Sequence, residues 1–314
     1  MQLEDVKQQP VSPRQHRAND LRRSFRRLAS NKLSLVGLGI VSVFLFMMIF
    51  ANWIAPYPQD ANGAIHFGDR FSPPSWQHWF GTDEAGRDIL TNIIFGTRIT
   101  LLGALLVQIL NAGIGIPVGM VAGYMGGKIA TILMRIADVF MTIPPLVLAL
   151  VATTVFRPNL ELEIIAVAIS FWPWLARVVY SVVLSLREEQ FVEAAKLAGK
   201  GRLSIMFGDI FPHLSSVLSV KMTLDTGFAI LFIATLSFLG LGGPGSTPDW
   251  GYMAAIGRNG LPNIWWPVTF PGLTIFVAVL GFSLLGDGLR DFLDVQLESV
   301  GNIPKQLMQK VAKS

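Results

Sequence analysis

The amino-acid sequence predicts an all-α polytopic membrane protein with six transmembrane helices, and three observations support that class. Hydrophobic residues make up 52% of the 314 residues and charged residues only 15%, unlike the composition of a soluble chain. Six segments are long and apolar enough to cross a bilayer, which takes about 20 residues each. The basic residues outside these segments gather on one side of the membrane. The predicted spans are residues 33–55, 99–123, 129–156, 162–185, 214–240 and 267–289.

A basic tail, residues 1–32, precedes the first span. A cluster of this kind next to an apolar helix is typical of a cytoplasmic anchor rather than of an arm that binds nucleic acid. The apolar run is longer than that of a signal peptide and has no clear cleavage site, so we expect it to remain as a membrane anchor. The tail's charge comes chiefly from Arg14, Arg17, Arg22, Arg23, Arg26, Arg27 and Lys32.

The distribution of Lys and Arg predicts the orientation in the membrane. With the amino terminus inside, the inner segments hold 17 of these residues and the outer segments hold five. The positive-inside rule therefore places both termini, including the tail 291–314, and the polar segment 187–213 in the cytoplasm.

The first span and a long outer loop together form the region 33–98. The loop contains Trp76 and Trp79, which suit a membrane interface. It ends in the string FGTDEAGRDILTNIIFGTRITL, which leads into the second span. Thr82 and Asp83 are predicted to cap a short helix that runs through Asp88.

Residues 99–290 form the predicted core of the membrane domain. In its second span Gly115, Gly119 and Gly123 recur every four residues, a spacing that permits close helix contact in lipid. Prolines are expected to bend several of the spans. These prolines are Pro117, Pro144, Pro145, Pro173 and Pro271.

Charged residues within the spans are candidates for a translocation path, because charge in a membrane usually faces a bundle interior or a water-filled cavity. Arg135 with Asp138, and Lys221 with Asp225, lie on one helix face each, and mutual neutralisation explains them better than substrate binding does. Arg177 has no partner near it in sequence and is the stronger candidate. The residues proposed to line a path are Arg177, Asn111 and Asp225.

The polar segment EAAKLAGKGRLSIMFGDIFP, residues 193–212, lies between two spans. Its first residues favour a helix, and Gly199 and Gly201 then break the pattern. An amphipathic piece follows, and Pro212 is expected to end it. Its apolar residues are Leu203, Ile205, Met206 and Phe207, and its polar ones are Arg202 and Asp209.

Four motifs in this order resemble those of ATP-binding-cassette (ABC) importer permeases of the dipeptide, oligopeptide and nickel family, C-type subunit. They are the Glu-Ala-Ala segment, the string before the second span, Asp249-Trp250-Gly251 and the closing Gly286-Asp287-Gly288-Leu289-Arg290-Asp291. The resemblance covers roughly residues 30 to 295. It implies a six-helix type I importer domain in the bacterial inner (plasma) membrane.

The resemblance also implies partners. These are a second, B-type permease subunit, two ATPase subunits that bind ATP and Mg²⁺, and an extracytoplasmic solute-binding protein. Phe211 and His213 depart from the usual Leu and Asn but keep an apolar and a hydrogen-bonding side chain. The residues that match the ATPase-coupling motif are Glu193, Ala194, Ala195, Gly199, Ile210 and Pro212.

We expect no catalytic or metal site in the chain itself. It has no cysteine and its four histidines stand far apart. The nearest approach to a phosphate-binding loop, Gly123 to Lys128, is one residue short and is followed by Ile129. The alternatives are a secondary transporter that uses intramembrane acidic residues and a membrane-embedded enzyme or scaffold. The solute stays open among dipeptides, oligopeptides, nickel chelates, glutathione and opines, with peptides favoured.

Overall fold

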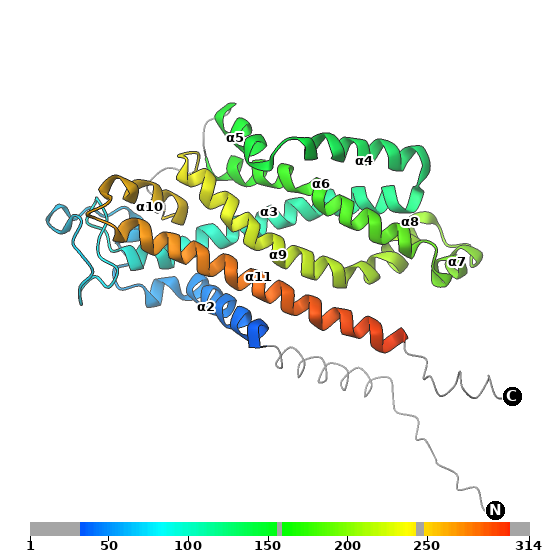
Figure 1. The fold of residues 1–314 in the computed structure, drawn as a ribbon, viewed down its shortest axis with the longest axis horizontal. Coiled ribbons are helices and arrows are strands. Elements are labelled where there is room, and N and C mark those ends of the chain that lie inside the picture. The colour runs from blue at the N-terminus through cyan, green and yellow to red at the C-terminus, as the bar shows by residue number, and fades with distance from the viewer. Residues whose placement is uncertain (1–31, 156–158, 243–247, 302–314) are drawn as a thin grey trace, which may run out of the picture.

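The computed structural model describes residues 32–155, 159–242 and 248–301, and these residues form an elongated helical bundle (Figure 1). The basic cluster between Arg14 and Arg27 and the end of the carboxyl tail lie outside the described residues. No strand is assigned within the described ranges, where Thr82 and Asp88 form an isolated bridge. The longer helices are α2 Lys32–Ile54, α3 Ile89–Met125, α4 Gly127–Thr142, α5 Pro145–Val155, α6 Leu160–Leu186, α9 Phe211–Phe238 and α11 Trp266–Gly301. The shorter ones are η1 Asp60–Asn62, η2 Phe67–Asp69, α7 Gln190–Leu197, α8 Arg202–Ser204, the π-helix η3 Ile205–Ile210, α10 Trp250–Gly257 and η4 Arg258–Gly260.

Five described helices are long and apolar enough to cross a membrane: α2, α3, α6, the α8–α9 unit and the apolar part of α11. The third predicted span, residues 129–156, is not a single straight helix. It consists of α4 and α5, which are bent by 83° at the break between them. Ile143 is extended at the break because the proline after it disfavours helical backbone, and Pro144 and Pro145 offer no N–H to continue the ladder.

The glycine stripe of α3 lies against α6, as predicted. A Cβ atom on Gly119 would lie 2.5 Å from the carbonyl oxygen of Ala176, and one on Gly123 would lie 2.7 Å from the Cβ of Val183. Only a residue without a side chain fits at such distances. The two helix backbones therefore approach closely, which is how helices gain packing energy in lipid.

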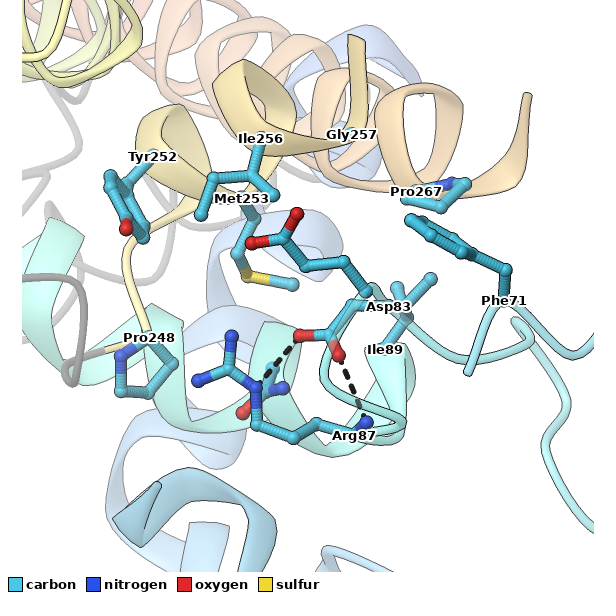
Figure 2. Close-up of a pocket in the computed structure, with 12 residues that line it drawn as sticks. Phe71, Asp83, Arg87, Ile89, Pro248, Tyr252, Met253, Ile256, Gly257 and Pro267 are labelled. Carbon is cyan, nitrogen blue, oxygen red and sulfur yellow. Dashed lines mark hydrogen bonds and ion pairs between the residues drawn. The ribbon is translucent and has the colours of Figure 1, made fainter. Parts of the chain in front are cut away.

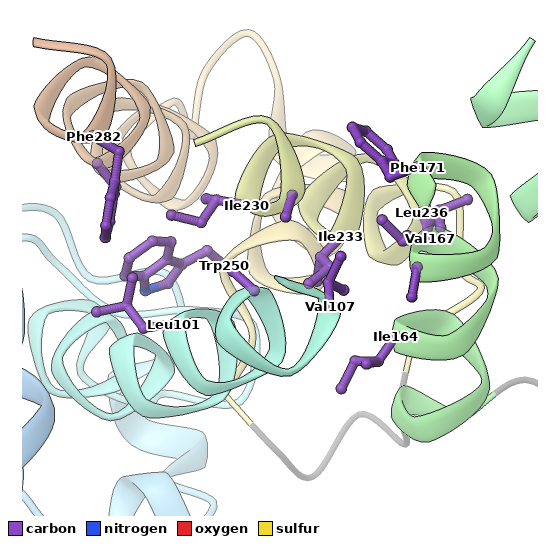
Figure 3. Close-up of a cluster of buried hydrophobic side chains, with 14 of the residues drawn as sticks. Leu101, Val107, Ile164, Val167, Phe171, Ile230, Ile233, Leu236, Trp250 and Phe282 are labelled. Carbon is purple, nitrogen blue, oxygen red and sulfur yellow. The ribbon is translucent and has the colours of Figure 1, made fainter. Parts of the chain in front are cut away.

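The central core surrounds Trp250, the first residue of α10. This indole is fully buried, and its Nε1 donates a hydrogen bond of 3.0 Å to the carbonyl oxygen of Ile93 in α3. Figure 3 shows Trp250 next to Leu101 and Ile230. The packed aromatic ring and its satisfied N–H together hold α10 against α3 and α9.

The loop at residues 55–88, called the outer loop after its predicted side, is built around two buried aspartates at the end of the bundle that carries α10 (Figure 1). Asp88 accepts a hydrogen bond of 2.7 Å from the backbone N–H of Thr91 and contacts His78 at 3.0 Å. Asp60 accepts one of 2.8 Å from the N–H of Asp88 and contacts His66 at 2.9 Å. These contacts tie the loop to the start of α3.

The prediction of a short helix from Thr82 through Asp88 is wrong. Asp83 instead accepts hydrogen bonds from the backbone N–H groups of Ala85 and Arg87 and pairs with the Arg87 guanidinium, which closes a turn. Asp88 is the cap that starts α3. The second span consequently begins ten residues earlier than the predicted residue 99.

Candidate functional site

The polar 190–212 segment folds back on itself at the end of the bundle opposite the outer loop (Figure 1). It consists of α7, a turn, α8, η3 and the first residues of α9. The predicted helix at Glu193-Ala194-Ala195 is present as α7. The start of α4 and the described end of α11 lie at this same end (Figure 1).

One side of this segment is anchored to the bundle. Val192 and Ala195 of α7 are buried against Ile205 and Ile210 of η3, and all four belong to a core cluster that continues into α3, α6 and α9. Such burial contributes about 25 cal/mol for each Å² of apolar surface removed from water. These buried contacts fix this side of the segment to the ends of α3, α6 and α9.

The turn after α7 is a Schellman motif. The N–H of Gly199 donates to the carbonyl oxygen of Lys196 at 3.0 Å, and that of Lys200 donates to Ala195 at 3.1 Å. Gly199 has φ +76°, the left-handed backbone that glycine adopts without steric cost. The Lys200 ammonium then bonds both carboxylate oxygens of Asp209, at 2.8 and 3.0 Å, which braces the turn against η3.

We predict that Gly199→Ala lowers the free energy of unfolding by about 1 kcal/mol, the cost of left-handed backbone for a residue with a Cβ. Gly201→Ala is the matched control, because Gly201 has an ordinary φ and nothing within 4 Å of an added Cβ. Thermal unfolding of the two purified variants measures the difference. Equal stability of the two would contradict the role assigned to the turn.

Pro212 does not end the helix, contrary to the prediction. The chain runs from η3 directly into α9, and Pro212 lies in the first turn of α9. The N–H of Phe211 reaches back five residues to the carbonyl oxygen of Met206. This wider π turn leaves room for a ring that lacks an N–H, so the proline is tolerated within a continuous helical path.

The other side of the segment faces outward. Glu193, Ala194, Gly199 and Pro212 are exposed, whereas Ala195 and Ile210 are buried and act as anchors. Leu197, which was not predicted as a site residue, is 85% exposed. Of the apolar residues of the predicted amphipathic piece, Ile205 and Met206 are buried, whereas Leu203 and Phe207 are 69% and 53% exposed. The segment thus presents apolar side chains that this chain leaves uncovered.

Arg177 of α6 pairs with Asp138 of α4, so the predicted pairing of Asp138 with Arg135 is wrong. Arg135 is exposed, whereas Asp138 is half-buried and contacts α6 through Arg177. Arg177 lines an open groove of about 620 Å³ between α4 and α6, together with Tyr180 and Arg187.

The other two candidates for a path lie elsewhere. Asn111 is fully buried and donates a hydrogen bond of 3.3 Å to Gln108, while its own side-chain oxygen has no partner. Asp225 is buried and accepts bonds of 2.5 and 2.6 Å from Lys221, so this predicted pair on α9 is confirmed. Neither residue belongs to the lining of the groove that contains Arg177.

A second, much smaller cavity lies at the outer end, between the outer loop and α10 (Figure 2). Its volume is about 20 Å³, enough for one water molecule. The Asp83–Arg87 pair and Tyr252 line it. Within the described ranges, no group of three or more His, Cys, Asp or Glu residues is arranged to hold a metal ion.

Two models of known protein families match parts of this chain. Residues 115–298 match the model of the binding-protein-dependent transport system inner membrane component, and residues 20–74 match the N-terminal transmembrane domain of oligopeptide transport permease C. The dipeptide transport system permease protein DppC of Escherichia coli K12 is 41% identical over 85% of this chain and 90% of its own length.

Two further relatives and one solved structure agree with this match. The dipeptide permease DppC of Alkalihalophilus pseudofirmus is 39% identical over 88% of this chain and 90% of its own. The probable D,D-dipeptide permease DdpC of Escherichia coli K12 is 38% identical over 85% and 89%. The fold resembles an inward-facing structure of the MetNI methionine ABC transporter with a TM-score of 0.54, at 19% identity over 65% of this chain and 97% of that chain.

Proposed function

The chain belongs to the inner membrane components of binding-protein-dependent transport systems, and from this premise we propose that it forms part of the translocation path for small peptides. It is a membrane-spanning permease subunit of an ABC importer. The peptide substrate is supported by the names of the relatives, several of which are dipeptide permeases. A secondary transporter is not supported by these comparisons.

The observation that carries the coupling mechanism is the two-sided 190–212 segment. Its buried side is fixed to the helices that carry Val183 and Leu214, and its outer side presents Glu193 and Leu197. A partner ATPase seated on the outer side would move the membrane helices through the buried side. ATP and Mg²⁺ are bound by two such subunits in this proposal, and a B-type permease subunit completes the path.

We propose that this segment and both termini face the cytoplasm of a bacterial cell, and that a solute-binding protein delivers peptide at the α10 end. The excess of Lys and Arg in the inner segments supports this orientation. It predicts that a cysteine introduced at Leu197, in the permease expressed without its ATPase subunits, reacts with a membrane-impermeant thiol reagent only from the cytoplasmic side. The chain has no native cysteine, so the signal would be unambiguous.

Introducing an arginine on the exposed face tests the coupling. In proteoliposomes that contain the partner subunits and the binding protein, Glu193→Arg and Gly199→Arg are each expected to lower uptake of labelled dipeptide at least tenfold, which corresponds to about 1.4 kcal/mol. Membrane insertion should stay unchanged, and ATP hydrolysis should continue without transport.

The matched control for Glu193→Arg is Glu161→Arg, which makes the same change of charge at an exposed glutamate at the end of α6 far from the 190–212 segment. Its uptake should remain at the wild-type level. If uptake survives both changes at Glu193 and Gly199, the coupling proposal fails. A substrate other than peptide would be revealed separately by ligand binding to the solute-binding protein.

A further inference from the structure

Three polar side chains that the proposed transport function does not use meet inside the bundle at the α10 end. Glu163 of α6 and Ser237 of α9 are fully buried, and Asp249, which caps α10, is 4% exposed. The Ser237 hydroxyl lies 3.2 and 3.3 Å from the two carboxyl oxygens of Glu163. It also lies near enough to Asp249 to favour the ionised form of that carboxyl group. The cluster therefore links three helices that are distant in sequence.

Close backbone packing seals this cluster. A Cβ atom on Gly242 would lie 2.4 Å from the Ser237 hydroxyl oxygen, and one on Gly251 would lie 2.2 Å from the carbonyl oxygen of Ala234. Side chains at either glycine would force the helix ends apart. In the described structure Glu163 has no exposed surface and Asp249 is 4% exposed, so bulk water has little access to either carboxyl group.

The donors at the cluster are too few for two ionised carboxylates. A serine hydroxyl carries one proton, so Ser237 can donate to only one of them at a time. Asp249 accepts a bond of 3.2 Å from the N–H of Gly251 at Oδ1, but its Oδ2 is buried and has no partner. An unpaired buried carboxylate oxygen is costly, and a proton on one of the groups would supply the missing donor.

Among the described residues, no Lys, Arg or His forms an ion pair with Glu163 or Asp249. The titratable residue of α10 is Tyr252, and α5, which packs against α6 and α9, carries no titratable side chain. The one arginine of α3, Arg98, bonds instead to α2. Two like charges this close in an apolar site cannot both persist.

From this geometry we propose that Glu163, Ser237 and Asp249 form a proton-binding site, in which one proton shared by the two carboxyl groups locks the outer ends of α6, α9 and α10 together. Two carboxyl groups and one hydroxyl offer too few oxygen ligands for Ca²⁺, which takes six to eight. Loss of the proton leaves two carboxylates facing each other and favours separation of α10 from α6.

The sign of the pH dependence follows from burial. Desolvation raises the pKa of Asp249 above its ordinary value, and its hydrogen bonds to Ser237 and to the backbone only partly oppose this. Because the raised pKa belongs to the folded state, the site's contribution to stability is complete below the ordinary aspartate range. It is lost as the pH rises through the raised value.

Infrared spectroscopy of the complete transporter in nanodiscs tests the proposal without any measurement of transport. We expect a carbonyl band of a protonated carboxylic acid at neutral pH that shifts in D₂O and disappears at alkaline pH. Glu163→Gln and Asp249→Asn should each remove the band, because the remaining carboxyl group then ionises or is no longer shared. Glu161→Gln, two residues from Glu163 on an exposed face, should leave it intact.

Hydrogen exchange of residues 250–257 provides a second readout that needs no variant. Relative to α2, exchange of α10 should accelerate as the band is lost on raising the pH. The proposal is overturned if no protonated carboxyl band exists at neutral pH, if both variants retain it, or if Na⁺ or Ca²⁺ at fixed pH abolishes it as a competing ligand of ionised carboxylates would.

Discussion

Gly119→Leu is expected to abolish accumulation of the folded chain. The side chain would have to enter a contact in which even a Cβ atom lies 2.5 Å from the Ala176 carbonyl oxygen and 2.6 Å from the Cβ of Val179. Backbone and a β-branched residue cannot rotate away, so α3 and α6 must separate. Overpacking typically lowers the free energy of unfolding by about 1–3 kcal/mol. Because the clash here is with backbone, we expect a loss at the upper end of that range or beyond it.

The same helix offers a control. Gly113 is exposed, and nothing lies within 4 Å of an added Cβ, so Gly113→Leu should insert and fold normally. Size-exclusion profiles of tagged protein in mild detergent measure the yield of each variant. A monodisperse peak of wild-type height for Gly119→Leu would show that the α3–α6 contact is not required for folding.

Hydropathy and local signals account for most of the fold. The first, fourth, fifth and sixth spans begin within a few residues of their predicted positions, because each is a long apolar run with a clear start. The start of the second span was predicted too late. The buried polar residues Thr91, Asn92 and Thr97 lower the hydropathy of its first turns without breaking the helix. The free-energy cost of burying these polar side chains is reduced by hydrogen bonds that form only in the folded structure. One example is the bond from the Thr97 hydroxyl to the Ile93 carbonyl oxygen.

The 190–212 segment shows where local reasoning holds and where it ends. The break of the helix at Gly199 was predicted from residue type alone, because few residues other than glycine adopt left-handed backbone. The division into buried Ala195 and exposed Leu197 could not be predicted, since it depends on which face of α7 meets η3. The π turn before Pro212 likewise follows from packing of the whole segment rather than from propensity.

Long-range polar contacts were the least predictable feature. Asp138 lies three residues from Arg135 but pairs with Arg177, 39 residues away, because α4 lies beside α6. Glu163 was not identified at all. It stands near the start of an apolar run where an acidic residue fits a helix amino terminus, and its partner Ser237 is 74 residues away. Spacing along the chain cannot reveal such pairs.

Arg177 provides the other prediction of a large effect. If its guanidinium lines the path of a peptide that carries a carboxylate, reversing its charge should lower uptake by the assembled transporter more than tenfold, about 1.4 kcal/mol or more. Arg177→Asp places two acidic groups opposite each other across the α4–α6 groove, so it should also lower the melting temperature. Uptake of labelled dipeptide and thermal unfolding, measured on the same preparations, give both effects.

The exchanged pair, Arg177→Asp with Asp138→Arg, separates a structural role from a role in transport. The double variant restores opposite charges between α4 and α6, and we expect it to recover most of the lost thermal stability. Uptake should stay low, because the guanidinium then projects from α4 and no longer from α6. Arg177→Lys should lie between wild type and Arg177→Asp, since it keeps the charge but loses the planar fork that binds a carboxylate through two bonds. Recovery of uptake in parallel with stability would mean that Arg177 only joins the two helices.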